Sequence, residues 1–286
     1  MLRRRCWLFL LRKPTWEREA VNLTTDLPNY EVYAVRYAGM ARTRRDNFIG
    51  GDPHDGPMPM DFFVWLLRTP DHTILVDTGF NARTAASRNR ELLRCPINAL
   101  ESLGVRPEHI RDVVITHLHY DHAGNLDKLP HARFHIQEAE MEYATGRCMC
   151  FGPLRHAYSV EDVVALVRNV YANRVVFHDG DGQVAPGVSL LKIGGHTKGL
   201  QSVRVHTRRG WIVLASDASH YYENMQEQRP FPIVYNVADM LSGYVRLEEA
   251  ASSPEHIIPG HDPQVMARYP ALQNDPDTVS LHVCPG

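Results

Sequence analysis

One hexapeptide near the middle of the chain constrains the fold and the chemistry more than any other feature. It reads His-Leu-His-Tyr-Asp-His from His117 to His122 and directly follows residues 113–116, whose β-branched side chains favour a buried strand. Alternate side chains at the end of a strand, here His117 and His119, can point to one place. The turn that follows can direct Asp121 and His122 to a second place beside it. The pattern therefore predicts a strand that ends at a site for two neighbouring metal ions.

Three further residues that can bind metals stand where other expected strands end. His196 follows two glycines after residues 188–193, Asp217 follows residues 211–215, and His261 follows a Pro-Gly pair. Each of them alone is more often a structural residue that makes hydrogen bonds, and the hexapeptide alone is also compatible with a histidine-rich surface loop. Together they supply the ligands that a pair of metal sites needs beyond those of one loop. The sixteen histidines of the chain agree, because imidazole is the commonest metal ligand.

Short apolar segments that favour strands alternate with segments that favour helices. Strands are expected at residues 30–37, 62–67, 73–77, 113–116, 132–136, 175–178, 188–193, 202–206 and 211–215, and helices at residues 97–103, 138–144, 160–170 and 237–251. Residues 47–59 contain three glycines and three prolines, which favours a surface loop. The alternation predicts an α/β fold in which two stacked sheets lie between helices. We expect one domain of residues 30–286 after an N-terminal extension of residues 1–29.

The charge of the chain bears on its partners. The 31 Lys and Arg against 33 Asp and Glu leave a net charge of −2, so no strong positive field is available for nucleic acid or an anionic membrane. We therefore expect a small neutral substrate, with no nucleic-acid and no membrane partner, and a monomer or a homodimer. Hydrophobic residues make up 44% and charged residues 22%, as in ordinary folded proteins.

Cysteine usage and the first residues bear on the compartment. The five cysteines are odd in number and scattered, which favours a reducing compartment, and we expect a cytoplasmic protein. Cys148 and Cys150 are a weaker alternative as a metal-binding pair. Residues 1–11 have the basic start and the apolar stretch of a poor signal peptide, but Arg-Lys-Pro follows where a cleavage site should be. An imperfect leader sequence, or a start codon assigned upstream of the true one, explains this segment better than a signal for export.

The order of the ligand-type residues resembles the metallo-β-lactamase fold superfamily. The resemblance extends from about Tyr30 to His261 and rests on the hexapeptide followed by His196, Asp217 and His261. It implies an αββα sandwich with a dinuclear metal site at one edge. The ligands that it implies are His117, His119 and His196 for one ion, Asp121, His122 and His261 for the other, and Asp217 as the bridge between them.

The resemblance also implies the support of the site and its ions. Asp77, in an Asp-Thr-Gly turn after an expected strand, would orient a histidine ligand through a hydrogen bond. The alternative is that Asp77 caps its own turn. Two divalent ions are expected, with zinc first, and iron, manganese and cobalt also suit mixed imidazole and carboxylate ligands.

Within the superfamily, the chain is most similar to quorum-quenching N-acyl homoserine lactone lactonases. The similarity rests on Asp217-Ala218-Ser219, on His122 together with His261, and on the Pro-Met-Pro-Met-Asp sequence of residues 57–61. One departure concerns the third residue after the bridging Asp, where those lactonases usually carry a tyrosine and this chain has His220. Either His220 replaces that phenol as a hydrogen-bond donor, or the neighbouring Tyr221 or Tyr222 reaches the site.

The resemblance implies hydrolysis of a lactone ring, most directly that of N-acyl homoserine lactones. A water held between two divalent ions loses a proton near neutral pH, and the resulting hydroxide would attack the ester carbonyl. Asp121 would pass a proton to the leaving oxygen, or would act as a ligand only. His220, or Tyr221 in its place, would donate a hydrogen bond to the carbonyl oxygen.

The acyl chain of such a substrate requires an apolar wall. Phe48, Met58 and Met60 are the expected lining residues, because flexible thioethers adapt to variable chains. Phe231 and Tyr235 are a second set of rim residues. Residues 146–158 form a long irregular segment that would cover the site or mediate a dimer contact.

Two other functions are alternatives to the lactonase hypothesis. The first is a dinuclear hydrolase of another small ester, a cyclic amide or a thioester of the glyoxalase II kind. The second is a non-enzymatic metal-binding protein. Coordination left open for water favours catalysis over a closed structural site.

Overall fold

The apolar segment near residue 64 becomes the centre of a strand that is buried on both faces. This strand, β2 (Met60–Arg68), pairs antiparallel with β1 (Glu31–Met40) on one side and with β3 (Thr73–Val76) on the other. Its side chains alternate between two hydrophobic cores, with Val64 in one core and Trp65 in the other. A strand covered on both faces is apolar throughout, which is why its sequence shows no polar alternation.

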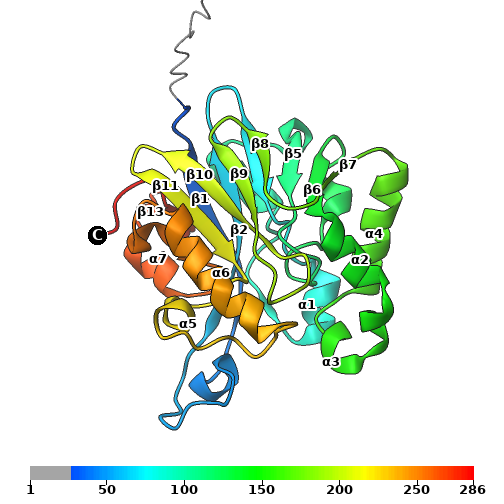
Figure 1. Cartoon of the computed structure of the whole chain (residues 1–286). Coiled ribbons are helices and arrows are strands. Elements are labelled where there is room, and N and C mark those ends of the chain that lie inside the picture. The colour runs from blue at the N-terminus through cyan, green and yellow to red at the C-terminus, as the bar shows by residue number, and fades with distance from the viewer. Residues whose placement is uncertain (1–26) are drawn as a thin grey trace, which may run out of the picture.

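The computed structural model describes residues 27–286 and contains two β-sheets that lie between helices (Figure 1). The larger sheet has the order β13-β14-β1-β2-β3-β5-β6-β7, with β4 paired to β1, and the smaller has the order β12-β11-β10-β9-β8. The remaining strands of the larger sheet are β4 (Glu91–Leu92), β5 (Asp112–Val114), β6 (Arg133–Gln137), β7 (Val175–His178), β13 (Ala271–Leu272) and β14 (Asp275–Ser280). The strands of the smaller sheet are β8 (Gly182–Ala185), β9 (Val188–Lys192), β10 (Gln201–Thr207), β11 (Gly210–Ser216) and β12 (Ile257–Pro259).

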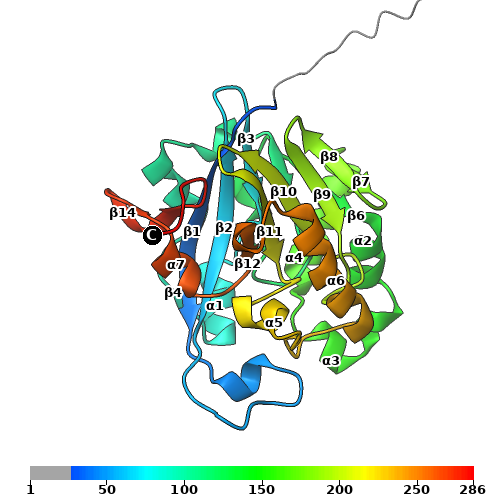
Figure 2. The same cartoon turned by 60° about the vertical axis from the view of Figure 1, so that its left-hand side comes forward.

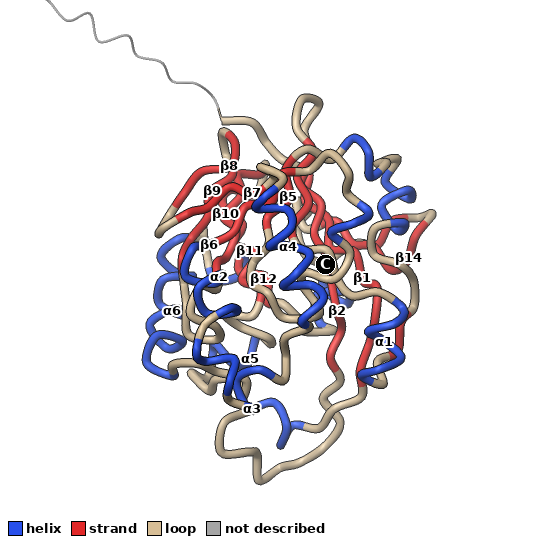
Figure 3. The backbone as a smooth tube through the Cα atoms, turned by 90° about the vertical axis from the view of Figure 1, so that its right-hand side faces the viewer, coloured by secondary structure: helices blue, strands red, loops and turns tan. Residues whose placement is uncertain are grey.

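Helices cover the outer face of each sheet (Figure 3). The α-helices are α1 (Ala82–Arg88), α2 (Glu138–Thr145), α3 (Gly152–Arg155), α4 (Val160–Tyr171), α5 (Tyr222–Gln226), α6 (Val237–Ala250) and α7 (Gln264–Arg268). Short 3-10 helices are η1 (Arg44–Asn47), η2 (Asn98–Leu103), η3 (Pro107–His109), η4 (Leu126–Lys128), η5 (Arg147–Cys150) and η6 (Pro254–His256). Figure 1 shows α6 on the side of the smaller sheet and α2 and α4 on the side of the larger one. The expected order of layers, helix–sheet–sheet–helix, is therefore confirmed.

Parallel pairing explains why several strand ends meet. β3 pairs parallel with β5 in the larger sheet, and β11 pairs parallel with β12 in the smaller sheet. The carboxyl ends of parallel neighbours lie at the same edge, so the residues that follow them are brought together. Residues 41–59, which contain η1, project from the end of the molecule where α3 and α5 also lie (Figure 2).

The local expectations differ from the structure in a few places. The segment at residues 97–103 forms the 3-10 helix η2 and not an α-helix, although it ends at Gly104 in the left-handed conformation, φ +70°, as its sequence indicates. Residues 146–158 are not irregular throughout, because they contain η5 and α3. The helix α1 and the strands β8 and β14 are not among the expected elements. The expectation of a leader within residues 1–29 concerns a segment of which residues 1–26 lie outside the described part of the chain.

None of the described helices is both long and apolar enough to cross a membrane.

Candidate metal centre

Strand ends from both sheets place the predicted ligand residues around one point. His117 follows β5, His196 follows β9, Asp217 is the first residue after β11, and His261 follows β12. All four side chains are buried, with 0 to 2% of their surface exposed. Gly195 makes the approach of His196 feasible, because it has φ +81° and a Cβ there would lie 2.6 Å from the Met240 backbone.

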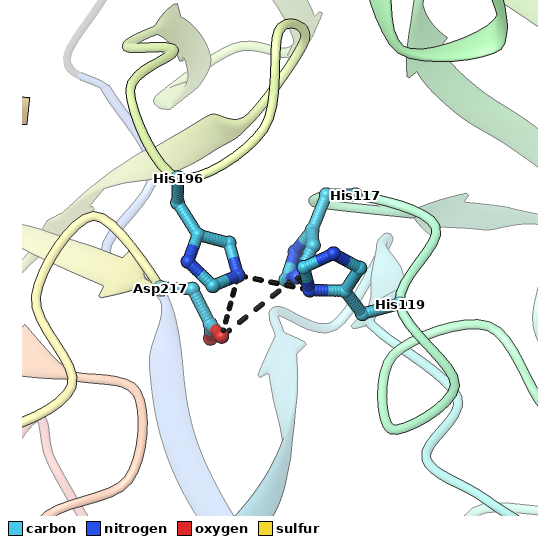
Figure 4. A group of neighbouring side chains, drawn as sticks. All are labelled: His117, His119, His196 and Asp217. Atoms are coloured by element: carbon cyan, nitrogen blue, oxygen red, sulfur yellow. Dashed lines mark hydrogen bonds and ion pairs between the residues drawn. The ribbon is translucent and has the colours of Figure 1, made fainter. Parts of the chain in front are cut away.

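The first group of candidate ligands is His117, His119, His196 and Asp217 (Figure 4). His119 Nδ1 lies 3.0 Å from His117 Nε2 and 2.9 Å from His196 Nε2. Asp217 Oδ2 lies 3.1 Å from His196 Nε2 and 3.7 Å from His117 Nε2. Three imidazoles and one carboxylate oxygen thus converge on a space the size of a metal ion.

The second group is Asp121, His122 and His261. Asp121 Oδ2 lies 3.8 Å from His122 Nε2 and 3.9 Å from His261 Nε2. The other oxygen of Asp217, Oδ1, lies 3.2 Å from His122 Nε2 and 3.0 Å from His261 Nε2. Asp217 therefore presents one oxygen to each group, which is the arrangement that a bridging carboxylate requires.

Backbone carbonyls hold the outer ring nitrogens of two of these histidines. His196 Nδ1 lies 2.7 Å from the Ile233 carbonyl oxygen, and His261 Nδ1 lies 2.9 Å from the Asp61 carbonyl oxygen. A carbonyl only accepts hydrogen bonds, so these Nδ1 atoms donate to it and each ring turns its Nε2 inward, toward the other candidate ligands. This is the usual arrangement of a metal-binding histidine.

His122 provides the sharpest test of whether a cation fits. Its Nδ1 lies 2.7 Å from Asp77 Oδ2, and its Nε2 is buried without a hydrogen bond to any described residue, although Asp217 Oδ1 is 3.2 Å away. A buried ring nitrogen and a carboxylate oxygen this close together require a positive charge between them, either a proton or a metal ion. The donor set fits divalent cations, because imidazole and carboxylate are both ligands of zinc and related metals.

The electrostatics of the two groups differ. Burial and the charges of neighbouring histidines hold the pKa of His117 and of His119 well below the ordinary value, so both rings are neutral and free to bind a metal. Burial also opposes protonation of His122, but Asp217, Asp77 and Asp121 outweigh it and raise the pKa of His122 well above its ordinary value. The acidic residues thus attract positive charge to the second group.

Asp77 lies directly behind the second group. Besides His122, its carboxylate accepts hydrogen bonds from the backbone N–H of Thr116 at 2.7 Å and from the Thr116 hydroxyl at 2.8 Å. Asp77 is fully buried and has φ +61°, a conformation that a non-glycine residue adopts only when its surroundings hold it there. The structure therefore places Asp77 in contact with His122, one of the candidate ligands.

Glu140 is a supporting residue that the sequence analysis missed. This fully buried carboxylate on α2 accepts hydrogen bonds from the backbone N–H of Leu118 at 2.9 Å and of Gly199 at 3.1 Å. It also accepts from the hydroxyls of Tyr158 at 2.9 Å and Thr197 at 2.6 Å. Glu140 thereby joins the loop of the hexapeptide to the loop of His196. An acidic residue on an amphipathic helix is normally solvated, so its sequence carries no sign of this role.

A cavity of about 110 Å³ opens beside the two groups. Its walls contain His119, Asp121, His196, Asp217, His220 and His261, together with Met40, Arg42, Met60, Arg88, Arg90, Tyr120, His156, Ala157, Phe231 and Ile233. Larger hollows of about 520 and 660 Å³ lie elsewhere on the surface, but none of the clustered ligands lines them. The small cavity is the one that the candidate ligands line, and His156 is also part of the wall of an apolar hollow of about 410 Å³.

Of the three residues expected to form the apolar wall, Met60 lines the cavity and the other two do not. Phe48 is buried and packs against two guanidinium groups, those of Arg229 at 4.0 Å and Arg44 at 5.3 Å from its ring centre. Met58 packs at the edge of the core on the helix side of the larger sheet. The apolar wall is instead completed by residues such as Phe231.

The residues after Asp217 take different directions. His220 lines the cavity, with its Nε2 3.1 Å from Asp217 Oδ2 and its ring stacked on Phe231 at 3.7 Å. Burial lowers the pKa of His220 to about 3, so the ring is neutral. Tyr221 does not reach the cavity, because its hydroxyl donates to the Pro59 carbonyl at 3.2 Å within the core. Tyr222 is also absent from the cavity wall and packs under Arg268, 3.8 Å from its ring centre.

Of the two other residues expected at the rim, one lines the cavity and one does not. Phe231 lines the cavity, whereas Tyr235 packs against Tyr143 at 5.0 Å and does not. His156 and Ala157, in the segment that was expected to cover the site or to mediate a dimer contact, form part of the wall.

Comparisons with known proteins agree with this geometry. Residues 63–267 match the family model described as the metallo-beta-lactamase superfamily. An N-acyl homoserine lactonase of a Bacillus species is 30% identical over 223 residues, which cover 71% of this chain and 82% of that protein. A Mycobacterium tuberculosis protein named "Probable metallo-hydrolase" is 26% identical over 247 residues, covering 76% of each chain. A solved structure of a quorum-quenching N-acyl homoserine lactone lactonase, 25% identical, has a TM-score of 0.70 over 83% of this chain and 95% of that one.

Proposed function

We propose that this chain, which belongs to the metallo-β-lactamase superfamily, uses two divalent metal ions to open the lactone ring of N-acyl homoserine lactones. The family and the lactonase relatives make it a metallo-hydrolase. The observation that carries the finer proposal is Asp217, whose two oxygens face two separate groups of buried ligands. Zinc is the expected metal.

The residues that would hold the ions are those of the two groups. His117, His119 and His196 would bind one ion, Asp121, His122 and His261 would bind the other, and Asp217 would bind both. Ions bound there supply Lewis acidity and an activated water for hydrolysis. Asp77 and Glu140 would hold the ligand loops in place, because each joins segments that carry ligands.

Two residues would act on the substrate itself. Asp121 lines the cavity, and its carboxylate would carry a proton to the alkoxide that leaves when the ring opens. His220 also lines the cavity, and a ring N–H there would donate a hydrogen bond to the carbonyl oxygen of the substrate. Tyr221 has no part in this proposal, since its hydroxyl bonds within the core.

A second candidate function is hydrolysis of another small ester, a cyclic amide or a thioester. One observation favours it: His220 stands where the lactonases that this chain resembles usually carry a tyrosine. A purely metal-binding protein is less well supported, because the candidate ligands border an open cavity and are not enclosed.

An assay of the metal-loaded protein tests the proposal. We would measure metal content and then kcat/KM for N-hexanoyl homoserine lactone, a plain lactone, a cyclic amide and an acyl thioester. Ring opening of the homoserine lactone as the fastest reaction supports the proposal. Cleavage of the thioester alone would replace it with the second candidate, and no turnover by protein carrying two ions would reject both.

A further inference from the structure

Three arginines line the same small cavity as the candidate metal ligands. Arg42 lies in the loop that follows β1, Arg88 is the last residue of α1, and Arg90 stands between α1 and β4. All three are partly exposed, so they lie at the opening of the cavity and not in its depth. We call these three residues the arginine mouth.

Within residues 27–286, none of the three arginines forms an ion pair with a carboxylate. Arg42 donates to the side-chain oxygen of Asn47 at 2.6 Å and to the carbonyl of Asp46. Arg88 donates to the carbonyl oxygens of His156 and Tyr158, both at 2.9 Å. These contacts hold the guanidinium groups through neutral acceptors and leave each of them without a directly paired carboxylate.

Arg90 is also held by neutral partners. Its Nε donates to the Tyr120 hydroxyl at 2.9 Å, and its Nη1 donates to the Arg88 carbonyl at 2.8 Å. In the described part of the chain, Nη2 of Arg90 and Nη1 of Arg42 make no hydrogen bond. Two NH2 groups on charged side chains are thus available at the same opening.

Aromatic side chains connect the arginine mouth to the candidate metal centre. The Arg42 guanidinium lies 4.9 Å from the centre of the Phe231 ring, and that ring stacks on His220, the neighbour of Asp217. On the other wall, the Arg88 guanidinium lies 4.1 Å from the centre of the Tyr120 ring, one residue before Asp121. Stacked rings fix the direction of a guanidinium, so the three charges have defined positions beside the reacting end of the cavity.

The charges around the cavity do not balance at its opening. The acidic residues of the wall are Asp121 and Asp217, and both face histidines at the deep end. Burial lowers the pKa of Arg42; the nearby Asp46 carboxylate opposes this effect, and the positive charge of Arg90 adds to it. Like charges held close together in a partly buried place are unfavourable unless an anion joins them, and a guanidinium binds carboxylate or phosphate oxygens through paired hydrogen bonds.

We propose that the arginine mouth binds an oxyanion, a carboxylate or a phosphate, carried by the substrate on the part that does not react. This inference rests on the proposed function, and it names the substrate class: an anionic acyl lactone or ester, not the neutral one that a net charge of −2 led us to expect. The net charge does not indicate this site, because it is a sum over the whole chain and does not show where three positive side chains lie close together.

A matched pair of substrates tests the inference. N-hexanoyl homoserine lactone and its analogue with a carboxylate in place of the terminal methyl group have equal chain lengths and differ in charge. We expect the metal-loaded protein to show a kcat/KM at least about tenfold higher for the anionic lactone, and the advantage to shrink as salt is added. A third lactone with a terminal phosphate distinguishes the two oxyanions. Equal kcat/KM for the neutral and the anionic lactones would overturn the inference and leave the proposed function standing.

Variants assign the effect to the arginines. The double substitution Arg42→Gln with Arg90→Gln should reduce the ratio of the two kcat/KM values to below about threefold, and Arg42→Lys with Arg90→Lys should restore part of it. Arg83→Gln is the matched control, because Arg83 is an exposed residue of α1 outside the cavity wall. An unchanged ratio in the double Gln variant would contradict the assignment.

Binding of adipate, a dicarboxylate, tests the arginine mouth without turnover. Calorimetric titration should show at least about tenfold tighter binding to the metal-loaded wild type than to the double Gln variant with the same metal content. Because the candidate metal centre is retained in both proteins, a carboxylate that binds only there would give equal affinities and would refute the inference. This measurement also decides the inference if no lactone is hydrolysed and the proposed function fails.

Discussion

The deep end of the cavity and its opening are built from different parts of the fold. Candidate ligands at the deep end follow strands of both sheets, are almost fully buried, and are held by buried partners such as Asp77 and Glu140. The opening is formed by Arg42, Arg88 and Arg90, which come from a loop and from the end of a short helix. The difference indicates that the strand ends set the chemistry and that the loops set the choice of substrate. The following predictions test how far the two regions act separately.

The largest effect is expected from Asp217→Asn. The amide keeps the shape of the side chain but loses the charge and one of the two oxygens that face the ligand groups. We expect metal content to fall below two ions per chain and turnover to fall by about three orders of magnitude. Metal analysis together with kinetics measures both. His131→Ala, which removes an exposed histidine, is the control and should change neither.

Glu140→Gln tests the support of the deep end. The amide can accept at one atom only, so at least one of the N–H and O–H groups that now donate to Glu140 loses its partner. We expect metal affinity to fall by roughly 10- to 100-fold, as for other residues that orient metal ligands, while the ratio between anionic and neutral lactones stays as in the wild type. Competition with a chelator measures the affinity. Glu142→Gln changes an exposed glutamate on the same helix and should leave the metal affinity unaltered. An equal loss of metal affinity in both variants would contradict a specific role of Glu140 in supporting the ligand loops.

His220 lies between the two regions, and His220→Ala shows to which of them it belongs. If His220 donates a hydrogen bond to the substrate, its removal should lower kcat by roughly a hundredfold and leave the metal content unchanged. His220 also lies within reach of Asp217 and His261 in a group that is able to hold an ion. A fall in metal content would therefore place His220 among the ligands and would contradict its role as a donor.

The smallest effect is expected from Asp52, which stabilises the loop that contains Arg42. Its carboxylate accepts from the His54 backbone N–H at 2.8 Å, from Arg229 at 2.9 Å and from Arg44 at 3.0 Å, and these bonds lower the pKa of Asp52 to about 2. A carboxyl whose pKa is lower in the folded state stabilises it above the ordinary pKa near 4, and this contribution is lost as the pH falls toward 2.

Hydrogen exchange measures that effect. Protection of residues 44–58 should decline between about pH 4 and pH 2, and Asp52→Asn should show the same loss of protection already at neutral pH, with residues 113–117 unchanged. Asp71→Asn, in an exposed turn between β2 and β3, is the control. Loss of protection in both regions together would mean that the deep end and the opening do not behave separately.

The deep end could be predicted from sequence because its signals are local. Apolar strands followed at once by His or Asp recur at His117, His196, Asp217 and His261, and a strand end fixes the direction of the residue after it. Glu140 escaped prediction because nothing in an acidic helix residue shows that its carboxylate is buried.

The opening was poorly predicted for a physical reason. Phe48 and Met58 stand close in sequence to Met60, but the path of a long loop decides which of them reaches the cavity, and a loop follows no periodic pattern. Arg88 and Arg90 depend on α1, a helix with no long apolar side chain in its sequence, whose ends are fixed by the Asn81 cap and by the left-handed Asn89. Those caps were the signal that could have placed the two arginines.

The most direct test of the account is the anomalous diffraction of crystals of the metal-loaded protein. We predict two metal peaks, one beside His117, His119 and His196 and the other beside Asp121, His122 and His261, with one oxygen of Asp217 about 2.0 to 2.2 Å from each ion. A single peak in fully loaded crystals, or two ions with Asp217 bound to neither, would contradict the claim that strand ends from both sheets build one dinuclear site.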